Sequence, residues 1–159
     1  MAWLLPVRNP ANAVYGTVTA GALLAAEGGL RETYLETVGS LTLAIVLYWF
    51  AHSYADVLGL RLSKRGALTW GELWHTFVQD WAIVRGAAAP VLAVVVAWAA
   101  GAQQTVAVTA GVWAAVASLI AFELAAGLRS KAKAPEMALQ VTAGATLGIG
   151  ILALRALLH

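Results

Sequence analysis

Five long apolar stretches alternate with short polar connections along the chain. They cover residues 11–26, 37–60, 82–100, 105–128 and 137–158. A helix crosses the hydrocarbon core of a bilayer with about 20 mainly apolar residues, so each stretch is close to the length of one transmembrane helix. The pattern predicts an all-α, polytopic transmembrane helical bundle with five spans, in which residues 1–159 form a single integral membrane domain.

The basic residues of the connections gather on one side of these spans. Five crossings put Arg8 on the same face as two basic clusters, which are Arg61, Lys64 and Arg65, and Arg129, Lys131 and Lys133. Arg31 and Arg155 fall on the other face. Because short basic loops stay in the cytoplasm, we expect a cytoplasmic N-terminus and an external C-terminus. We expect a multi-pass protein of a bacterial inner (plasma) membrane.

Composition supports the membrane class independently of the spans. Apolar residues make up 61% of the chain and charged residues 11%, whereas about a quarter of the residues in soluble domains are charged. The basic residues lie beside the spans, where they attract anionic lipid headgroups, and we expect no nucleic acid partner. The absence of cysteine excludes disulfides and thiolate chemistry.

A Trp-rich segment precedes the third apolar stretch. Thr69 and Glu72 match a capping box, which predicts a helix start at that point. Trp70, Trp74 and Trp81 then recur at helical spacing, while polar residues occupy the other faces. The segment from about 70 to 81 is predicted to be an amphipathic helix anchored in the cytoplasmic interface. The alternative interpretation is that this helix gates a cytoplasmic opening or docks a partner.

Ionisable side chains within the spans are the candidates for chemistry. Tyr48, His52 and Asp56 are spaced by four residues, so they share one stripe of a helix. Arg85 and Glu123 fall at comparable depth, and the expected ion pairs join Arg85 to Asp56 or to Glu123. Such groups face the bundle interior or find partners, because ionised side chains are unfavourable in hydrocarbon.

Further polar residues lie toward the cytoplasmic ends of other spans. Asn12, Tyr15 and Gln140 can complete a polar cavity around the ionisable residues. An imidazole beside a carboxylate can relay protons near neutral pH. The alternative is structural, with the charged groups only pairing with one another or reaching the headgroups.

Glycines in two spans predict close helix contacts. Gly144 and Gly148 form a GxxxG pair in the fifth stretch, and Gly16 contributes to a small-residue face in the first. These faces pack within the bundle or between copies of the chain.

The pattern favours a small oligomeric channel or an ion- or proton-coupled permease with a cytoplasm-facing polar site. The alternative is a non-catalytic subunit or assembly partner of a larger membrane complex, in contact with a partner membrane subunit. The sequence carries no phosphate-binding loop or metalloprotease motif, and its three histidines are isolated from one another. Catalysis therefore has no support in the sequence, and we expect no metal and no cofactor.

Overall fold

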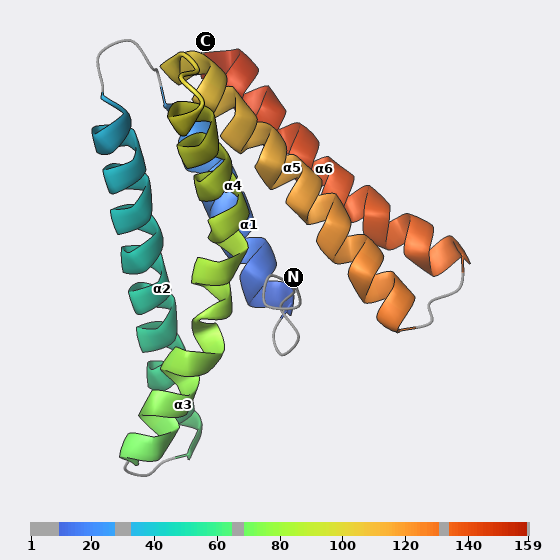
Figure 1. Cartoon of the computed structure of the whole chain (residues 1–159). Coiled ribbons are helices and arrows are strands. Elements are labelled where there is room, and N and C mark those ends of the chain that lie inside the picture. The colour runs from blue at the N-terminus through green and yellow to red at the C-terminus, as the bar shows by residue number, and fades with distance from the viewer. Residues whose placement is uncertain (1–9, 28–32, 65–68, 131–133, 159) are drawn as a thin grey trace.

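The computed structural model describes residues 10–27, 33–64, 69–130 and 134–158, and this part of the chain is helical with short connections (Figure 1). The helices are α1 (Pro10–Ala26), α2 (Tyr34–Lys64), α3 (Trp70–Asp80), α4 (Ala82–Ala99), α5 (Gln104–Arg129) and α6 (Ala134–Leu158). Residues 8, 31, 65, 131 and 133, on which part of the charge pattern rests, lie outside the described residues. The predicted all-α class is confirmed.

Four segments are long and apolar enough to cross a membrane. They are Tyr34–Ser63, Trp70–Ala99, Gln104–Arg129 and Ala134–Leu158. The helix α1 is not among them, since its 17 residues extend only about 25 Å, less than a hydrocarbon core of about 30 Å. Four of the five expected spans therefore lie in helices with the length and composition to cross a membrane, and the number of spans stays a prediction.

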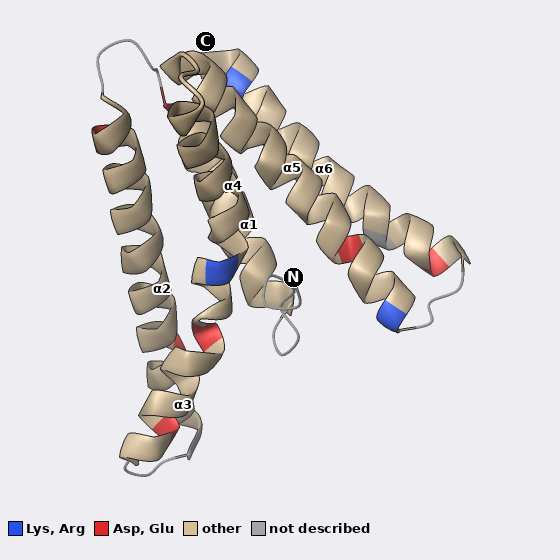
Figure 2. Cartoon of the chain, viewed as in Figure 1, with Lys and Arg blue, Asp and Glu red and all other residues tan. Residues whose placement is uncertain are grey.

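The outer surface of the bundle is apolar. Large side chains such as Leu43 and Phe50 of α2, Val96 of α4 and Trp113 of α5 are exposed. Charged residues are sparse along the helices (Figure 2). An apolar surface this extensive is unfavourable in water and favourable against lipid tails, so the surface agrees with a membrane-embedded protein.

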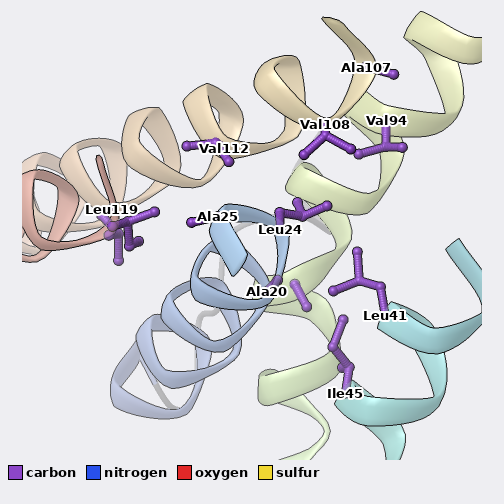
Figure 3. Close-up of a cluster of buried hydrophobic side chains, with 12 residues drawn as sticks. Ala20, Leu24, Ala25, Leu41, Ile45, Val94, Ala107, Val108, Val112 and Leu119 are labelled. Atoms are coloured by element: carbon purple, nitrogen blue, oxygen red, sulfur yellow. The ribbon is translucent and has the colours of Figure 1, made fainter. Parts of the chain in front are cut away.

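The shortest of the apolar helices, α1, forms the centre of the bundle. It packs against α4, α5 and α6, and α2 packs mainly on α4 and α3. Ala20, Leu24 and Ala25 of α1 are fully buried in the core, together with residues such as Val94 and Val112 (Figure 3). Small side chains such as Ala13, Gly16 and Ala20 line the buried face of α1, whereas Tyr15 and Leu23 lie on its exposed face.

Glycine allows α1 and α4 to cross at very short range. A Cβ atom at Gly16 would overlap the backbone carbonyl of Ile83, and a Cβ atom at Gly86 would overlap that of Ala13. Such contact between backbones is available only where both helices carry small residues. The contact fixes α1 against the first half of α4.

A proline in α4 explains a polar contact at the same crossing. Pro90 lies inside α4 and has no N–H, so the carbonyl of Gly86 lacks its usual helical donor. The Thr17 hydroxyl lies 2.8 Å from the Gly86 oxygen and 2.9 Å from the Ala13 oxygen, and it can donate to either. A threonine of a neighbouring helix thus satisfies the carbonyl that the proline leaves open.

Thr17→Val should lower the free energy of unfolding by about 1–2 kcal/mol, because it leaves a buried carbonyl without a donor. Pro90→Ala restores the N–H to α4, so the same Thr17 substitution should cost less in that background. Unfolding in mixed micelles measures both values. Thr142→Val, at an exposed threonine bonded to its own helix, is the matched control. An equal loss in both backgrounds would contradict the role of Pro90.

The predicted Trp-rich helix forms as α3. Thr69 caps it, and the reciprocal capping box with Glu72 is confirmed. The chain turns at Trp81, where α3 ends and α4 begins. Trp74 is 64% exposed, whereas Asp80 is 2% exposed, so α3 directs its aromatic side outward and its polar end toward the other helices.

Candidate functional site

A histidine and an aspartate of α2 stand side by side. His52 Nε2 and Asp56 Oδ2 lie 4.0 Å apart, as expected for residues one helical turn apart. The ring of Tyr48, one turn earlier, lies 6.0 Å from the His52 ring, and Tyr15 of α1 lies at the same distance from it. The predicted stripe therefore faces α1.

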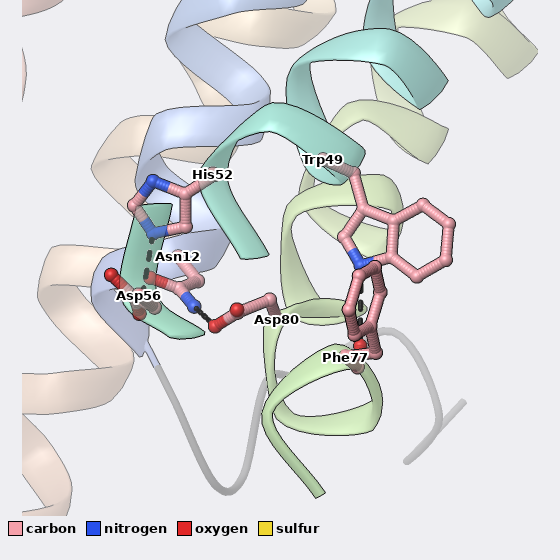
Figure 4. A network of polar contacts seen from close by, with 6 residues as sticks. All are labelled: Asn12, Trp49, His52, Asp56, Phe77 and Asp80. Carbon is pink, nitrogen blue, oxygen red and sulfur yellow. Dashed lines mark hydrogen bonds and ion pairs between the residues drawn. The ribbon is translucent and has the colours of Figure 1, made fainter. Parts of the chain in front are cut away.

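A second aspartate reaches this place from the end of α3. The Asp80 carboxylate accepts a hydrogen bond of 2.6 Å from Asn12 Nδ2 of α1 (Figure 4). Its other oxygen, Oδ2, is shielded from solvent and has no hydrogen-bond partner. The Ser53 hydroxyl is also fully buried and without a partner at bonding geometry, although it lies beside the same carboxyl group. Buried polar atoms without partners are uncommon and often mark functional positions.

We call His52, Asp56 and Asp80 the His–Asp centre. One nitrogen or oxygen atom of each residue lies within 4.8 Å of the corresponding atoms of the other two. Exposure falls steadily through the centre, since the side chains of Asp56 and His52 are 52% and 25% exposed and Asp80 is 2% exposed. The centre therefore leads from an accessible carboxylate to a buried one.

These residue types can hold a cation, but the spacing decides which kind. Tetrahedral ligands at about 2.1 Å from a zinc ion are separated from one another by about 3.4 Å. The three atoms of the His–Asp centre lie within 4.8 Å of one another, which allows a cation between them, and the His52–Asp56 pair is at 4.0 Å, wider than in a closed zinc site. The 4.0 Å between His52 Nε2 and Asp56 Oδ2 is also longer than a direct hydrogen bond, so protons would pass between these groups through a bridging water.

Two of the candidate residues lie away from the His–Asp centre. Among the described residues Arg85 forms no ion pair, so the expected pairing with Asp56 or Glu123 is not observed. Arg85 instead lines an aromatic groove between α2, α3 and α4. Glu123 of α5 lies against α6, with its Cγ atom 2.8 Å from the Cβ position of Gly144. Gln140 belongs to α6, and its side chain lies outside the described residues.

The glycines of α6 face a neighbour within the same chain. Cβ atoms at Gly144 and Gly148 would lie 2.8 Å from Glu123 Cγ and 2.9 Å from Val116 Cγ1, both of α5. Within the described part of the chain, this face is therefore occupied by α5.

Sequence reasoning missed Asp80 and Ser53. Asp80 falls within the segment predicted to be an interfacial helix, where it is one of several polar residues, and it stands two residues before the apolar stretch that begins at residue 82. A carboxylate at that position is a signal, because it enters the membrane region with the helix. Ser53 gave no such signal, since serine is common in transmembrane helices.

Comparisons with known proteins identify no relative: no family model, curated protein or solved structure matches the chain.

Proposed function

We propose that this chain is a small proton-coupled permease or proton channel whose exchange site is the His–Asp centre. The observation that carries the proposal is the Asp80 carboxylate, which is 2% exposed and keeps one oxygen without a partner beside His52 and Asp56. A carboxylate in this setting favours an arriving proton or cation.

Each residue has a distinct role in this proposal. Asp56, at the exposed end, takes up the proton and gives it to His52 through a water that bridges the 4.0 Å between them. His52 accepts the proton on one ring nitrogen and releases one inward. Asp80 receives it, while Asn12 holds that carboxylate in place through the 2.6 Å hydrogen bond. Tyr15 and Tyr48 restrict the movement of the His52 ring by packing around it.

The membrane arrangement is part of the same proposal. Five spans in a bacterial inner membrane, with the short helix α1 as the first of them, would place the N-terminus in the cytoplasm and the C-terminus outside. The opening at Asp56 would then face the cytoplasm, because Asp56 precedes the basic residue Arg61 on α2. Beyond Asp80 lies the apolar core of the bundle, which offers protons no path within one copy. Self-association of the chain would therefore supply the rest of the pathway.

Proton flux into liposomes that contain the purified protein tests the proposal. A potassium gradient with valinomycin drives protons inward, and an enclosed pH dye reports them. The wild-type protein should exceed empty liposomes, and His52→Gln should lower its flux by about a hundredfold, the scale set by positioned proton-transfer groups. His75→Gln, at an exposed histidine of α3, should leave the flux unchanged.

Two outcomes would overturn this function. If the wild-type flux equals that of empty liposomes, the chain alone does not conduct protons. Passage of divalent metal ions without protons would make the centre a metal site instead.

A further inference from the structure

An aromatic groove lies between α2, α3 and α4, apart from the His–Asp centre. It has a volume of about 520 Å³ and is lined by Trp49, Trp74, Phe77, Val78, Trp81 and Arg85. This volume is within the range of about 300–1,000 Å³ that is typical of small-ligand sites. Five of the six side chains are apolar or aromatic, so the groove suits an apolar ligand.

The inner wall of the groove is held rigidly. Trp49 donates its indole N–H to the Phe77 carbonyl at 3.2 Å (Figure 4). Its ring meets the rings of Phe77 and Trp81 edge-on, at centroid distances of 5.7 and 5.2 Å. Edge-to-face contacts of this kind fix ring orientations. The shape of the groove therefore exists before any ligand arrives.

The outer wall is open to the surroundings. Trp74, Val78 and Trp81 are 64%, 54% and 40% exposed. In a membrane-embedded chain these side chains meet lipid, and Trp is enriched at the level of the headgroups. The molecules that reach the groove most readily are therefore lipids.

Arg85 gives the groove a charge that lacks a counterpart. It is the one charged residue of the lining, and among the described residues it forms no ion pair. Its Nε atom is shielded from solvent and has no hydrogen-bond partner. The carboxylate of Asp80, five residues earlier in the chain, is bonded to Asn12 of α1. A phosphate in the groove would meet the terminal nitrogens of this guanidinium group rather than the shielded Nε, and it can accept two parallel hydrogen bonds from them.

We propose that the aromatic groove binds one anionic phospholipid, with its phosphate on Arg85 and an acyl chain along Trp49, Trp74 and Trp81. The apolar walls favour a lipid over free phosphate, because inorganic phosphate would gain nothing from them. The proposal does not depend on proton transport, since none of the lining residues belongs to the His–Asp centre.

Native mass spectrometry in mild detergent tests the proposal, with phosphatidylglycerol and phosphatidylcholine added in separate titrations. The wild-type protein should retain one phosphatidylglycerol molecule in preference to phosphatidylcholine. Arg85→Gln should weaken phosphatidylglycerol binding by about tenfold or more, the scale of one charge-assisted hydrogen bond. Arg61→Gln, at an exposed arginine of α2 outside the groove, should not weaken it.

Two further measurements separate the contribution of the aromatic walls to lipid binding from that of the Arg85 charge. Trp74→Ala removes an exposed aromatic wall and should weaken the binding of both lipids without unfolding the chain. Inorganic phosphate at millimolar concentration should not displace the lipid. The proposal fails if Arg85→Gln binds phosphatidylglycerol as the wild type does, or if phosphate alone competes for the groove.

Discussion

Asp80→Asn should abolish proton flux while the protein keeps its fold. The asparagine has the same shape, and its amide oxygen can still accept the hydrogen bond from Asn12 that measures 2.6 Å in the wild type. It cannot take up a proton, so the inner end of the His–Asp centre no longer functions. We expect flux at the level of empty liposomes, and a thermal midpoint equal to or above that of the wild type, because a buried carboxylate is no longer required.

The neighbouring residue provides the control for this experiment. Gln79 is exposed and lies one position before Asp80, so Gln79→Ala should leave both flux and thermal midpoint unchanged. If Asp80→Asn keeps full flux, Asp80 is not part of the proton pathway. Loss of flux together with loss of the folded protein would instead show that the carboxylate has a structural role.

The second large effect concerns one methyl group at the crossing of α1 and α4. Gly16→Ala should lower the free energy of unfolding by about 3 kcal/mol or more, because the added Cβ atom overlaps the Ile83 carbonyl. Backbone atoms cannot rotate away as a side chain can, so the two helices must separate. Unfolding in mixed micelles, together with the yield of folded protein, measures the change.

A glycine-to-alanine substitution at two open positions should instead raise the free energy of unfolding. No atom lies within 4 Å of a Cβ placed at Gly150 of α6 or at Gly39 of α2. Gly150→Ala and Gly39→Ala should therefore raise stability by up to about 1 kcal/mol, through helix propensity alone. If Gly16→Ala proved as stable as these two variants, the close crossing of α1 and α4 would be wrong.

Hydrophobic length made the long helices predictable from the sequence. The stretch 105–128, for example, became Gln104–Arg129, and 82–100 became Ala82–Ala99. The capping box at Thr69 was predictable because it is a local pattern. The central position of α1 was not, because a helix that is apolar on all sides shows no face from which its neighbours can be inferred.

The candidate site was predictable only as far as one helix extends. Tyr48, His52 and Asp56 share a stripe because spacing by four is a property of the helix itself. The approach of Asp80 from α3 depends on the turn at Trp81, which no local pattern in the sequence marks. Arg85 was expected near Asp56 from depth alone, and depth does not specify the direction in which a side chain points around the helix.

The central position of α1 has a consequence for biogenesis. Among the described helices α1 is synthesised before the others, yet most of the surface that it packs against belongs to α4, α5 and α6, which follow later. Until they appear, a short helix carrying Asn12 and Thr17 has few partners for its polar groups. Its stable integration would thus follow the insertion of the later helices, making the order of assembly the reverse of the order of translation at this end of the chain.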